Sequence, residues 1–358
     1  MSRAEAVAAP PHVTRDLLHA MPKAELHVHL DGSLRPATMI ELAREHRQPL
    51  PSTDPDELGA IMRAEETANL EEYLRKFQVT LSLIQHADAL ERVAFELAED
   101  AARENVRYME VRYSPVLNTR AGLPLTEAVE APLRGLGRAE REYDIRTAVI
   151  ICGIRDMDPG TSRDLADLTV AFKGRGVVAF DLAGAEYNYP AKKHRDAFFT
   201  VINKNMATTI HAGEAYGPES IHQALHYCRA NRIGHGTRLH EDPELMRFVR
   251  DFQVPLEICL TSNVQTKAVR SFEEHPLRLY YDEGLVVTLN TDNRLVSGTT
   301  LTDEYWRAHR HLGFGWEELM DVARMGFQSA FLSWPEKQAM LARVEEEVRG
   351  LEVGSPGG

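Results

Sequence analysis

The sequence predicts an α/β fold, a (β/α)₈ TIM barrel with extra helices inserted between the first two strands. Eight short β-like runs recur along the 358 residues, and most precede a segment with helical spacing of apolar residues. Several runs are apolar at nearly every position, as expected for parallel strands covered on both faces. Polar residues beside glycine follow the runs, at the strand ends where such barrels carry catalytic groups.

The eight expected strands are short and are spread over most of the chain. They are 24–30, 107–113, 147–153, 177–182, 208–212, 232–235, 255–260 and 286–290. The alternating order of strand and helix favours a closed barrel. A doubly wound open sheet is the alternative, but it would group its ligands at one or two crossovers instead of spreading them around the sheet.

The first two expected strands are separated by about 75 residues, which is too many for one crossover helix. Segment 66–85 is strongly helical and carries an apolar stripe along one face. This stripe consists of Leu70, Tyr73, Leu74 and Phe77. By pattern alone it is either part of the core or a lid over the barrel mouth. No linker interrupts the chain, so we expect one barrel domain over 1–358, with 1–12 and 352–358 loosely ordered.

The composition excludes several functional classes. The formal net charge of −13 disfavours binding to nucleic acid or to anionic membranes. No apolar run approaches the roughly 18 residues of a membrane span, and segment 1–13 lacks the apolar core of a secretory signal. Three widely spaced cysteines, Cys152, Cys228 and Cys259, argue against a disulfide framework and favour the cytoplasm. The sequence gives no indication of the oligomeric state.

The first expected strand carries two histidines, His27 and His29. Residues two apart in a strand point to the same side, so both imidazoles project together. Two imidazoles on one rigid strand make a good clamp for a metal ion. A surface strand with two solvated histidines is the alternative for this short pattern.

The ends of other expected strands carry further histidines and acids. His211, His235 and Asp292 each stand at or just after the end of a strand. Such groups at equivalent ends of separate strands indicate a metal site. Three neutral imidazoles and one carboxylate, with no thiolate, suit one Zn²⁺ ion with a water completing its shell. The predicted zinc ligands are His27, His29, His211 and Asp292.

The number and identity of the metal follow from residue types. Barrel hydrolases with two metals typically bridge them with a modified lysine on the fourth strand, and segment 177–184 has no lysine. We therefore expect one zinc ion per chain. Iron and cobalt are alternatives, because they accept the same ligands.

Two residues beside the expected ligands suit proton chemistry. His235 can orient the attacking water and stabilise the developing negative oxygen. Glu214 lies three residues past His211, just beyond the strand, and is the natural proton carrier. The alternative for Glu214 is an acid at a helix N-terminus, where the helix dipole favours it.

Seven motifs together resemble the adenosine deaminase family, a branch of the amidohydrolase barrels. The resemblance extends from Met21 to about Leu341. The motifs are ELHVHLDGS (25–33), EVRYSP (110–115), DLAGAE (181–186), HAGE (211–214), RIGHGTRL (232–239), EICLTSN (257–263) and LNTDN (289–293). Each motif alone is weak, but their combination in this order is specific. The H-x-E and P-C-x-x-C pattern of other zinc deaminases is absent from the sequence.

The resemblance implies hydrolytic deamination of adenosine or 2′-deoxyadenosine to the inosine product plus ammonia. Zinc-bound hydroxide would attack purine C6, with His235 and Asp292 orienting it and Glu214 protonating N1. The backbone N–H of Gly184 would donate to purine N3, and Asp31 would contact the ribose 5′-hydroxyl. The substrate contacts expected from the resemblance are His29, Asp31, Gly184, Asn293, Leu70, Tyr73, Leu74 and Phe77, the last four on a hydrophobic gate helix.

One position departs from the family pattern. Many members have two consecutive aspartates where this chain has Asp292-Asn293, and the second contacts purine N7. The amide of Asn293 could donate to N7 directly. The substrate is therefore left open between adenosine, adenine and a 5′-modified adenosine such as aminofutalosine. Remoter alternatives are a non-catalytic binding protein on the same scaffold and a barrel hydrolase that cuts an amide or phosphoester.

Overall fold

Eight parallel strands form a barrel in the computed structural model, which describes residues 12–65 and 67–354. The strands are β1 (Lys23–His29), β2 (Val106–Tyr113), β3 (Arg146–Ile154), β4 (Val177–Ala183), β5 (Ala207–Ala212), β6 (Arg232–His235), β7 (Leu256–Ile258) and β8 (Val287–Leu289). Each strand pairs with the next in the sequence. All eight expected strands are present, and the predicted barrel is confirmed.

The barrel closes between its first and last strands. The backbone N–H of His29 donates to the carbonyl of Asp292 at 2.7 Å, and the N–H of Asp292 donates to the carbonyl of His27 at 2.9 Å. These bonds join β1 to the segment that follows β8. The closure therefore also holds His27 and His29, two candidate metal ligands of β1, next to Asp292, a third candidate.

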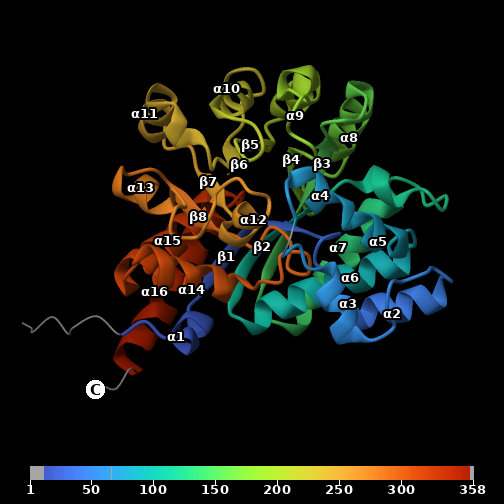
Figure 1. Cartoon of the computed structure of the whole chain (residues 1–358), viewed down its shortest axis with the longest axis horizontal. Helices are drawn as coiled ribbons and strands as arrows, with labels where there is room; N and C mark the ends of the chain where they lie inside the picture. Colours follow the sequence, from blue (N-terminus) through green and yellow to red (C-terminus); the bar gives the residue numbers. More distant parts are fainter. Residues whose placement is uncertain (1–11, 66, 355–358) are drawn as a thin grey trace, which may run out of the picture.

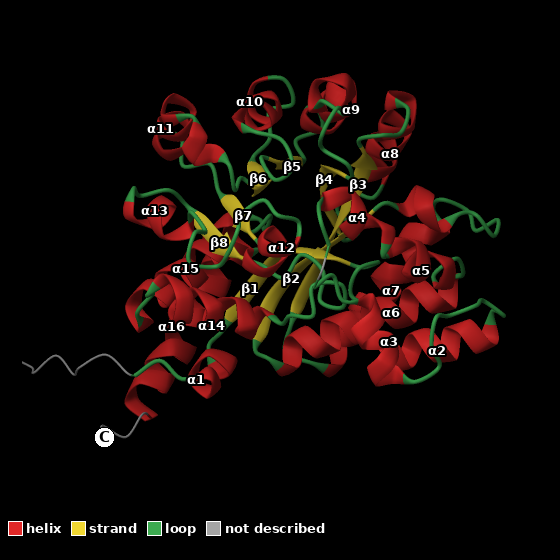
Figure 2. Ribbon diagram, viewed as in Figure 1, coloured by secondary structure: helices red, strands yellow, loops and turns green. Residues whose placement is uncertain are grey.

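Helices surround the strands, as Figures 1 and 2 show. Within the described residues they are α1 (Arg15–Ala20), α2 (Pro36–Glu45), α3 (Pro55–Met62), α4 (Leu70–Arg75), α5 (Phe77–Leu83), α6 (Ala87–Arg103), α7 (Glu127–Glu142), α8 (Pro159–Ala171), α9 (Arg195–Ile202), α10 (Pro218–His226), α11 (Pro243–Asp251), α12 (Leu260–Gln265), α13 (Leu277–Asp282), α14 (Leu301–Leu312), α15 (Trp316–Ser329) and α16 (Trp334–Gly354). The predicted extra helices between the first two strands are α2 to α5, which precede the crossover helix α6.

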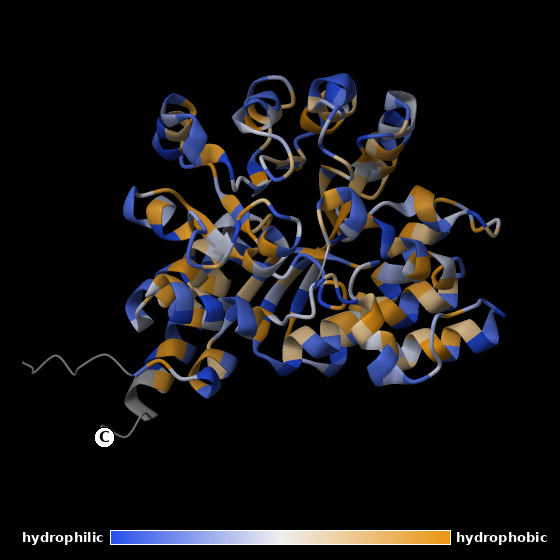
Figure 3. Cartoon of the chain, in the orientation of Figure 1, coloured by the Kyte–Doolittle hydropathy of each residue, from blue (hydrophilic) through white to orange (hydrophobic). Residues whose placement is uncertain are grey.

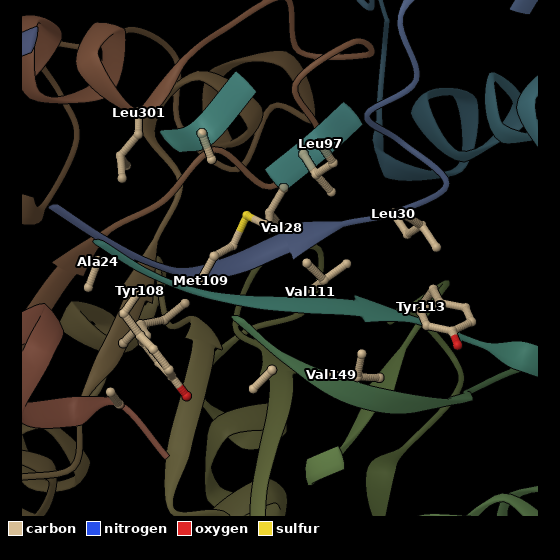
Figure 4. Close-up of a cluster of buried hydrophobic side chains, with 14 of the residues drawn as sticks. Ala24, Val28, Leu30, Leu97, Tyr108, Met109, Val111, Tyr113, Val149 and Leu301 are labelled. Carbon is tan, nitrogen blue, oxygen red and sulfur yellow. The ribbon is translucent and has the colours of Figure 1, made fainter. Parts of the chain in front are cut away.

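Two faces of each strand have different chemistry. Figure 4 shows Val28 of β1 and Val111 of β2 in one apolar cluster with Leu97 of α6 and Leu301 of α14. The intervening residues point the other way, into the barrel. Figure 3 shows that the outer helices mix hydrophobic and hydrophilic residues, as helices with one face toward solvent do.

The barrel interior is polar and charged. Arg112 of β2 donates to Asp181 of β4 at 3.1 Å and to Glu257 of β7 at 2.8 Å. A single side chain reaches both partners because all three project into the barrel, and none of them is exposed to solvent. Buried charges need such partners to offset their desolvation.

No helix within 12–65 and 67–354 combines the length and apolar character needed to span a bilayer. The three cysteines are buried and free of disulfides. The cytoplasmic location and the single-domain organisation expected from the sequence stay predictions.

Candidate active site

Four residues at the ends of different strands form a compact group of possible metal ligands. His27, His211, His235 and Asp292 each offer a ligand atom, and these atoms lie within 4.8 Å of one another. His29 lies outside this group, but its Nε2 is 3.0 Å from Nε2 of His211 and 3.4 Å from Oδ1 of Asp292. The structure thus brings the four predicted ligands together and adds His235 beside them.

The backbone is unusual at two of these positions. His235 and Asp292 have φ values of 63° and 59°, in the left-handed region that glycine prefers. Residues held there cost on the order of 1–3 kcal/mol each and occur often at functional sites. At Asp292 the barrel-closing hydrogen bonds to β1 hold this conformation. Both side chains are thereby turned toward the group.

Buried carboxylates orient two of the imidazoles. Nδ1 of His27 lies 2.8 Å from Oε2 of Glu257, and Nδ1 of His211 lies 3.0 Å from Oδ2 of Asp181. Each Nδ1 therefore carries the proton, which leaves the lone pair on Nε2 toward the group. Nε2 of His27 is buried and has no hydrogen-bond partner. A cation would satisfy this atom.

His235 has the opposite arrangement. Nδ2 of Asn263 lies 3.1 Å from its Nδ1, while Oδ1 of the same amide accepts from Thr237 at 3.0 Å. The Asn263 amide is therefore fixed with its N–H₂ toward His235. A neutral His235 then carries its proton on Nε2, where it donates instead of ligating. This hydrogen bonding separates His235 from the ligands and fits its predicted role beside them.

Protonation states follow from burial. Burial lowers the pKa of His29 and His235 well below the ordinary value, which keeps both imidazoles neutral. Burial and Arg112 also lower the pKa of His27, but the neighbouring carboxylates of Asp292 and Glu257 outweigh this and raise it. Burial alone would raise the pKa of Asp292, but the surrounding histidines hold it below its usual range. The group therefore pairs an ionised carboxylate with imidazole nitrogens.

Glu214 is the second acid of the site and has the opposite pKa shift. Burial, with repulsion from Asp292 and Glu186, raises the pKa of Glu214 well above its usual range. Its Oε2 is 3.5 Å from Nε2 of His235, and Thr266 donates to its Oε1 at 2.9 Å. This shift favours the protonated form of Glu214, whose carboxyl group can then act as an acid.

A carboxylate holds the loop that carries Glu214. Glu186 accepts hydrogen bonds from four consecutive backbone N–H groups, those of residues 213–216, at 2.6 to 3.0 Å. The turn begins at Gly213, whose φ of 75° suits glycine. This contact fixes the position of Glu214 relative to His211, at the end of β5.

His211, His235 and Asp292 of this group line a cavity of about 210 Å³, whereas His27 is fully buried. The predicted substrate contacts line the same cavity: His29, Asp31, Leu70, Tyr73, Leu74, Phe77, Gly184 and Asn293. The apolar stripe of segment 66–85 therefore faces the cavity. A larger cavity of about 600 Å³ lies between α1, α2, α3 and the segment after β8, and none of the candidate ligands lines it.

Three cavity residues have informative surroundings. Gly184 has a φ of 91°, which suits glycine. Oδ1 of Asp31 is buried without a hydrogen-bond partner, and burial raises the pKa of Asp31 to about 7. Asn293 was expected to offer its amide N–H₂ to the substrate. In the structure Nδ2 donates to the hydroxyl of Tyr73 at 2.9 Å, so one of its N–H groups is already used.

No role was predicted from the sequence for the residues that hold the candidate ligands and Glu214 in place. Arg112, Asp181, Glu186, Glu257 and Asn263 all stand within the recognised motifs, which was the available signal. A charged residue in a strand that is mostly buried, such as Arg112 in β2, also indicates a buried partner.

The fold and this site define a class of protein, the metal-dependent barrel hydrolases, in which imidazoles and a carboxylate at strand ends can hold a metal. The family model described as "Adenosine deaminase" matches residues 22–347. The chain belongs to the adenosine deaminase family and is a hydrolase of the deaminase type.

Individual relatives agree with this assignment. The chain is 42% identical over 345 residues to adenosine deaminase of Mycobacterium sp. strain JLS, covering 92% of this chain and 95% of that protein. It is 41% identical over 326 residues to a probable adenosine deaminase of Dictyostelium discoideum; the match covers 91% of this chain but only 42% of that protein. The solved structure of an adenine deaminase from Arthrobacter aurescens is similar, with a TM-score of 0.86 and 28% identity, covering 92% of this chain and 99% of that chain.

We expect Arg112→Met to lower the free energy of unfolding by about 3–5 kcal/mol, because it leaves Asp181 and Glu257 buried without this shared cation. Arg146→Met is the matched control, since the ion pair of Arg146 with Glu336 is about half exposed. Exposed pairs contribute about 0–1 kcal/mol. Urea unfolding of both variants measures the difference, and equal losses would refute the importance of the buried network.

Proposed function

We propose that this protein deaminates an adenine nucleoside, adenosine or 2′-deoxyadenosine, by hydrolysis to inosine or 2′-deoxyinosine and ammonia. The observation that carries the proposal is the meeting of a histidine–aspartate group and the buried acid Glu214 in one cavity. Family membership supports the reaction class.

The donor set fits one zinc ion. His27, His29, His211 and Asp292 would hold it, and the unpartnered Nε2 of His27 supports a cation there. When bound, zinc supplies a Lewis acid that lowers the pKa of water toward about 7. His235 is left out of the ligand set because its Nε2 carries a proton.

Proton positions assign the remaining roles. Glu214 donates its proton to purine N1, which draws electron density from C6 and prepares that carbon for attack. The N–H at Nε2 of His235 donates to the attacking water and holds it in place. Ser262 donates to Oδ2 of Asp292 at 2.6 Å, so Oδ1 remains for the metal and the water. The pKa values of Glu214 and Asp292 shift in opposite directions, so Glu214 serves as the acid of the site and Asp292 as its anion.

The cavity walls orient the substrate. The apolar side chains of Leu70, Leu74 and Phe77 cover the base and exclude water, which strengthens the electrostatic interactions inside. The backbone N–H of Gly184 donates to purine N3. Oδ1 of Asp31 accepts the hydrogen of the ribose 5′-hydroxyl.

A second candidate is deamination of adenine or of a 5′-modified adenosine. The similarity to an adenine deaminase supports the free base. The unpartnered Oδ1 of Asp31 favours a nucleoside, because a free base carries no hydroxyl to satisfy it. A non-catalytic binding protein is disfavoured, because such a protein would not need the protonated acid and the oriented imidazoles together.

A substrate panel tests the proposal. The zinc-loaded protein is mixed with adenosine, 2′-deoxyadenosine, adenine, AMP and aminofutalosine, and the ultraviolet change of deamination is followed. We expect the highest kcat/KM with adenosine and 2′-deoxyadenosine. Asp31→Ala should slow adenosine about tenfold and leave adenine nearly unchanged, because only the nucleoside loses a hydrogen bond. Highest activity with adenine would contradict the nucleoside assignment, and no activity with any compound would refute deamination.

Glu214→Gln should retain zinc but lose about 10²- to 10⁴-fold in kcat, because it removes proton transfer alone. His211→Ala should lose both zinc and activity. Metal content by atomic emission and kcat are measured on the same samples. A near-normal kcat for Glu214→Gln would overturn its acid role, and a fully metallated His211→Ala would overturn His211 as a ligand.

A further inference from the structure

A chain of hydrogen bonds connects helix α4 to the floor of the cavity. The hydroxyl of Tyr73, on α4, accepts a hydrogen bond from Nδ2 of Asn293 at 2.9 Å and lies 2.8 Å from Oγ of Ser297. All three residues are buried. Asn293 and Ser297 belong to the segment after β8, and Asn293 is the neighbour of the candidate ligand Asp292.

Helix α4 has few other attachments. Its buried residues Leu70 and Tyr73 belong to a small apolar cluster with Ala64 and Val296, separate from the main core. Figure 1 shows α4 as a short helix apart from the longer outer helices. A six-residue helix with so small a cluster is weakly anchored by packing. The Tyr73 hydroxyl adds a polar attachment to this packing.

Hydrogen bonds to other parts of the chain hold the segment after β8, to which Tyr73 bonds. The backbone N–H of Ala64 donates to the carbonyl of Val296 at 2.9 Å. Nε2 of Gln265 donates to the carbonyl of Ser297 at 3.0 Å. Tyr73 thus bonds to a fixed segment, so these bonds resist movement of α4.

One of the two bonds has a defined direction, because the Asn293 N–H₂ can only donate and the Tyr73 oxygen accepts from it. In the second bond one hydroxyl proton is shared between the oxygens of Tyr73 and Ser297. Burial raises the pKa of Tyr73 well above its usual value, so this proton stays in place. The amide of Asn293 is therefore turned with its N–H₂ toward Tyr73.

The other side of the amide is also confined. A Cβ on Gly32 would lie 1.8 Å from Oδ1 of Asn293, so only glycine leaves room for the amide. Oδ1 is buried without a hydrogen-bond partner. Between Gly32 and Tyr73 the amide has one orientation, and its second N–H remains available to a ligand.

We propose that Tyr73 is a positioning residue that acts through Asn293. Its hydroxyl fixes the Asn293 amide against the purine and couples closure of α4 over the cavity to that contact. This inference rests on the proposed function for the identity of the ligand. The alternative is that Tyr73 contributes apolar cover only, in which case its hydroxyl and Asn293 act independently.

A double-mutant cycle distinguishes the two. Tyr73→Phe, Asn293→Ala and the double variant are compared with wild type for kcat/KM with adenosine. We expect Tyr73→Phe to lower kcat/KM about tenfold, chiefly through KM, because it removes one buried hydrogen bond and no proton-transfer group. The double variant should be no worse than Asn293→Ala. Losses that multiply, or a loss confined to kcat, would overturn the proposal.

Two controls sharpen the cycle. Tyr113→Phe removes another buried tyrosine hydroxyl, whose bond goes to the carbonyl of Ala128, and should leave KM unchanged. Ser297→Ala should shift KM in the same direction as Tyr73→Phe. A shift in Tyr113→Phe as large as in Tyr73→Phe would indicate a general loss of stability and would refute the positioning role.

Hydrogen exchange separates this inference from the proposed function, because it needs no substrate. Amide exchange in residues 70–75 is measured in the ligand-free proteins. Tyr73→Phe and Asn293→Ala should each speed exchange there, and the double variant should add nothing. If wild type deaminates no compound of the panel, the proposed function fails, but hydrogen exchange still tests the coupling between Tyr73 and Asn293. Unchanged exchange in Tyr73→Phe would overturn this coupling.

Discussion

The site depends on one buried cation, Arg112, which holds Asp181 and Glu257 together inside the barrel. Burial alone would raise the pKa of Glu257, but Arg112 and Arg232 keep it well below its usual range. The ionised carboxylates then hold Nδ1 of His211 and of His27, which leaves each Nε2 toward the candidate metal position. The orientation of two imidazoles is thus a consequence of charge balance across strands that are distant in the sequence.

Chemically similar groups in this site have different roles because their surroundings differ. Asp292 and Glu214 are both buried carboxyl groups, yet histidines lower the pKa of the first while burial and neighbouring acids raise the pKa of the second. His27 and His235 are both imidazoles, yet a carboxylate on Nδ1 of one and an amide N–H on Nδ1 of the other give them opposite tautomers. Partners behind the ligands therefore decide which group binds, which donates and which accepts.

The sequence predicted the parts of the structure that local pattern encodes. The eight strands follow from short apolar runs, and the site follows from His27, His211, His235 and Asp292 at the ends of those runs. The hydrogen-bond partners were beyond prediction, because Arg112 meets Glu257 across 145 positions and Tyr73 meets Asn293 across 220. The left-handed backbone at His235 and Asp292 was also unpredictable, since a positive φ is uncommon for any residue with a side chain, even though Asp and His adopt it more often than most.

The most direct test of the account is a zinc titration. The protein is stripped of metal with a chelator, zinc is added back stepwise, and bound zinc and adenosine deamination are measured on each sample. The account predicts activity that rises in proportion to bound zinc and stops rising at one ion per chain. Full activity in the metal-free protein, or activity that requires a second ion, would contradict it.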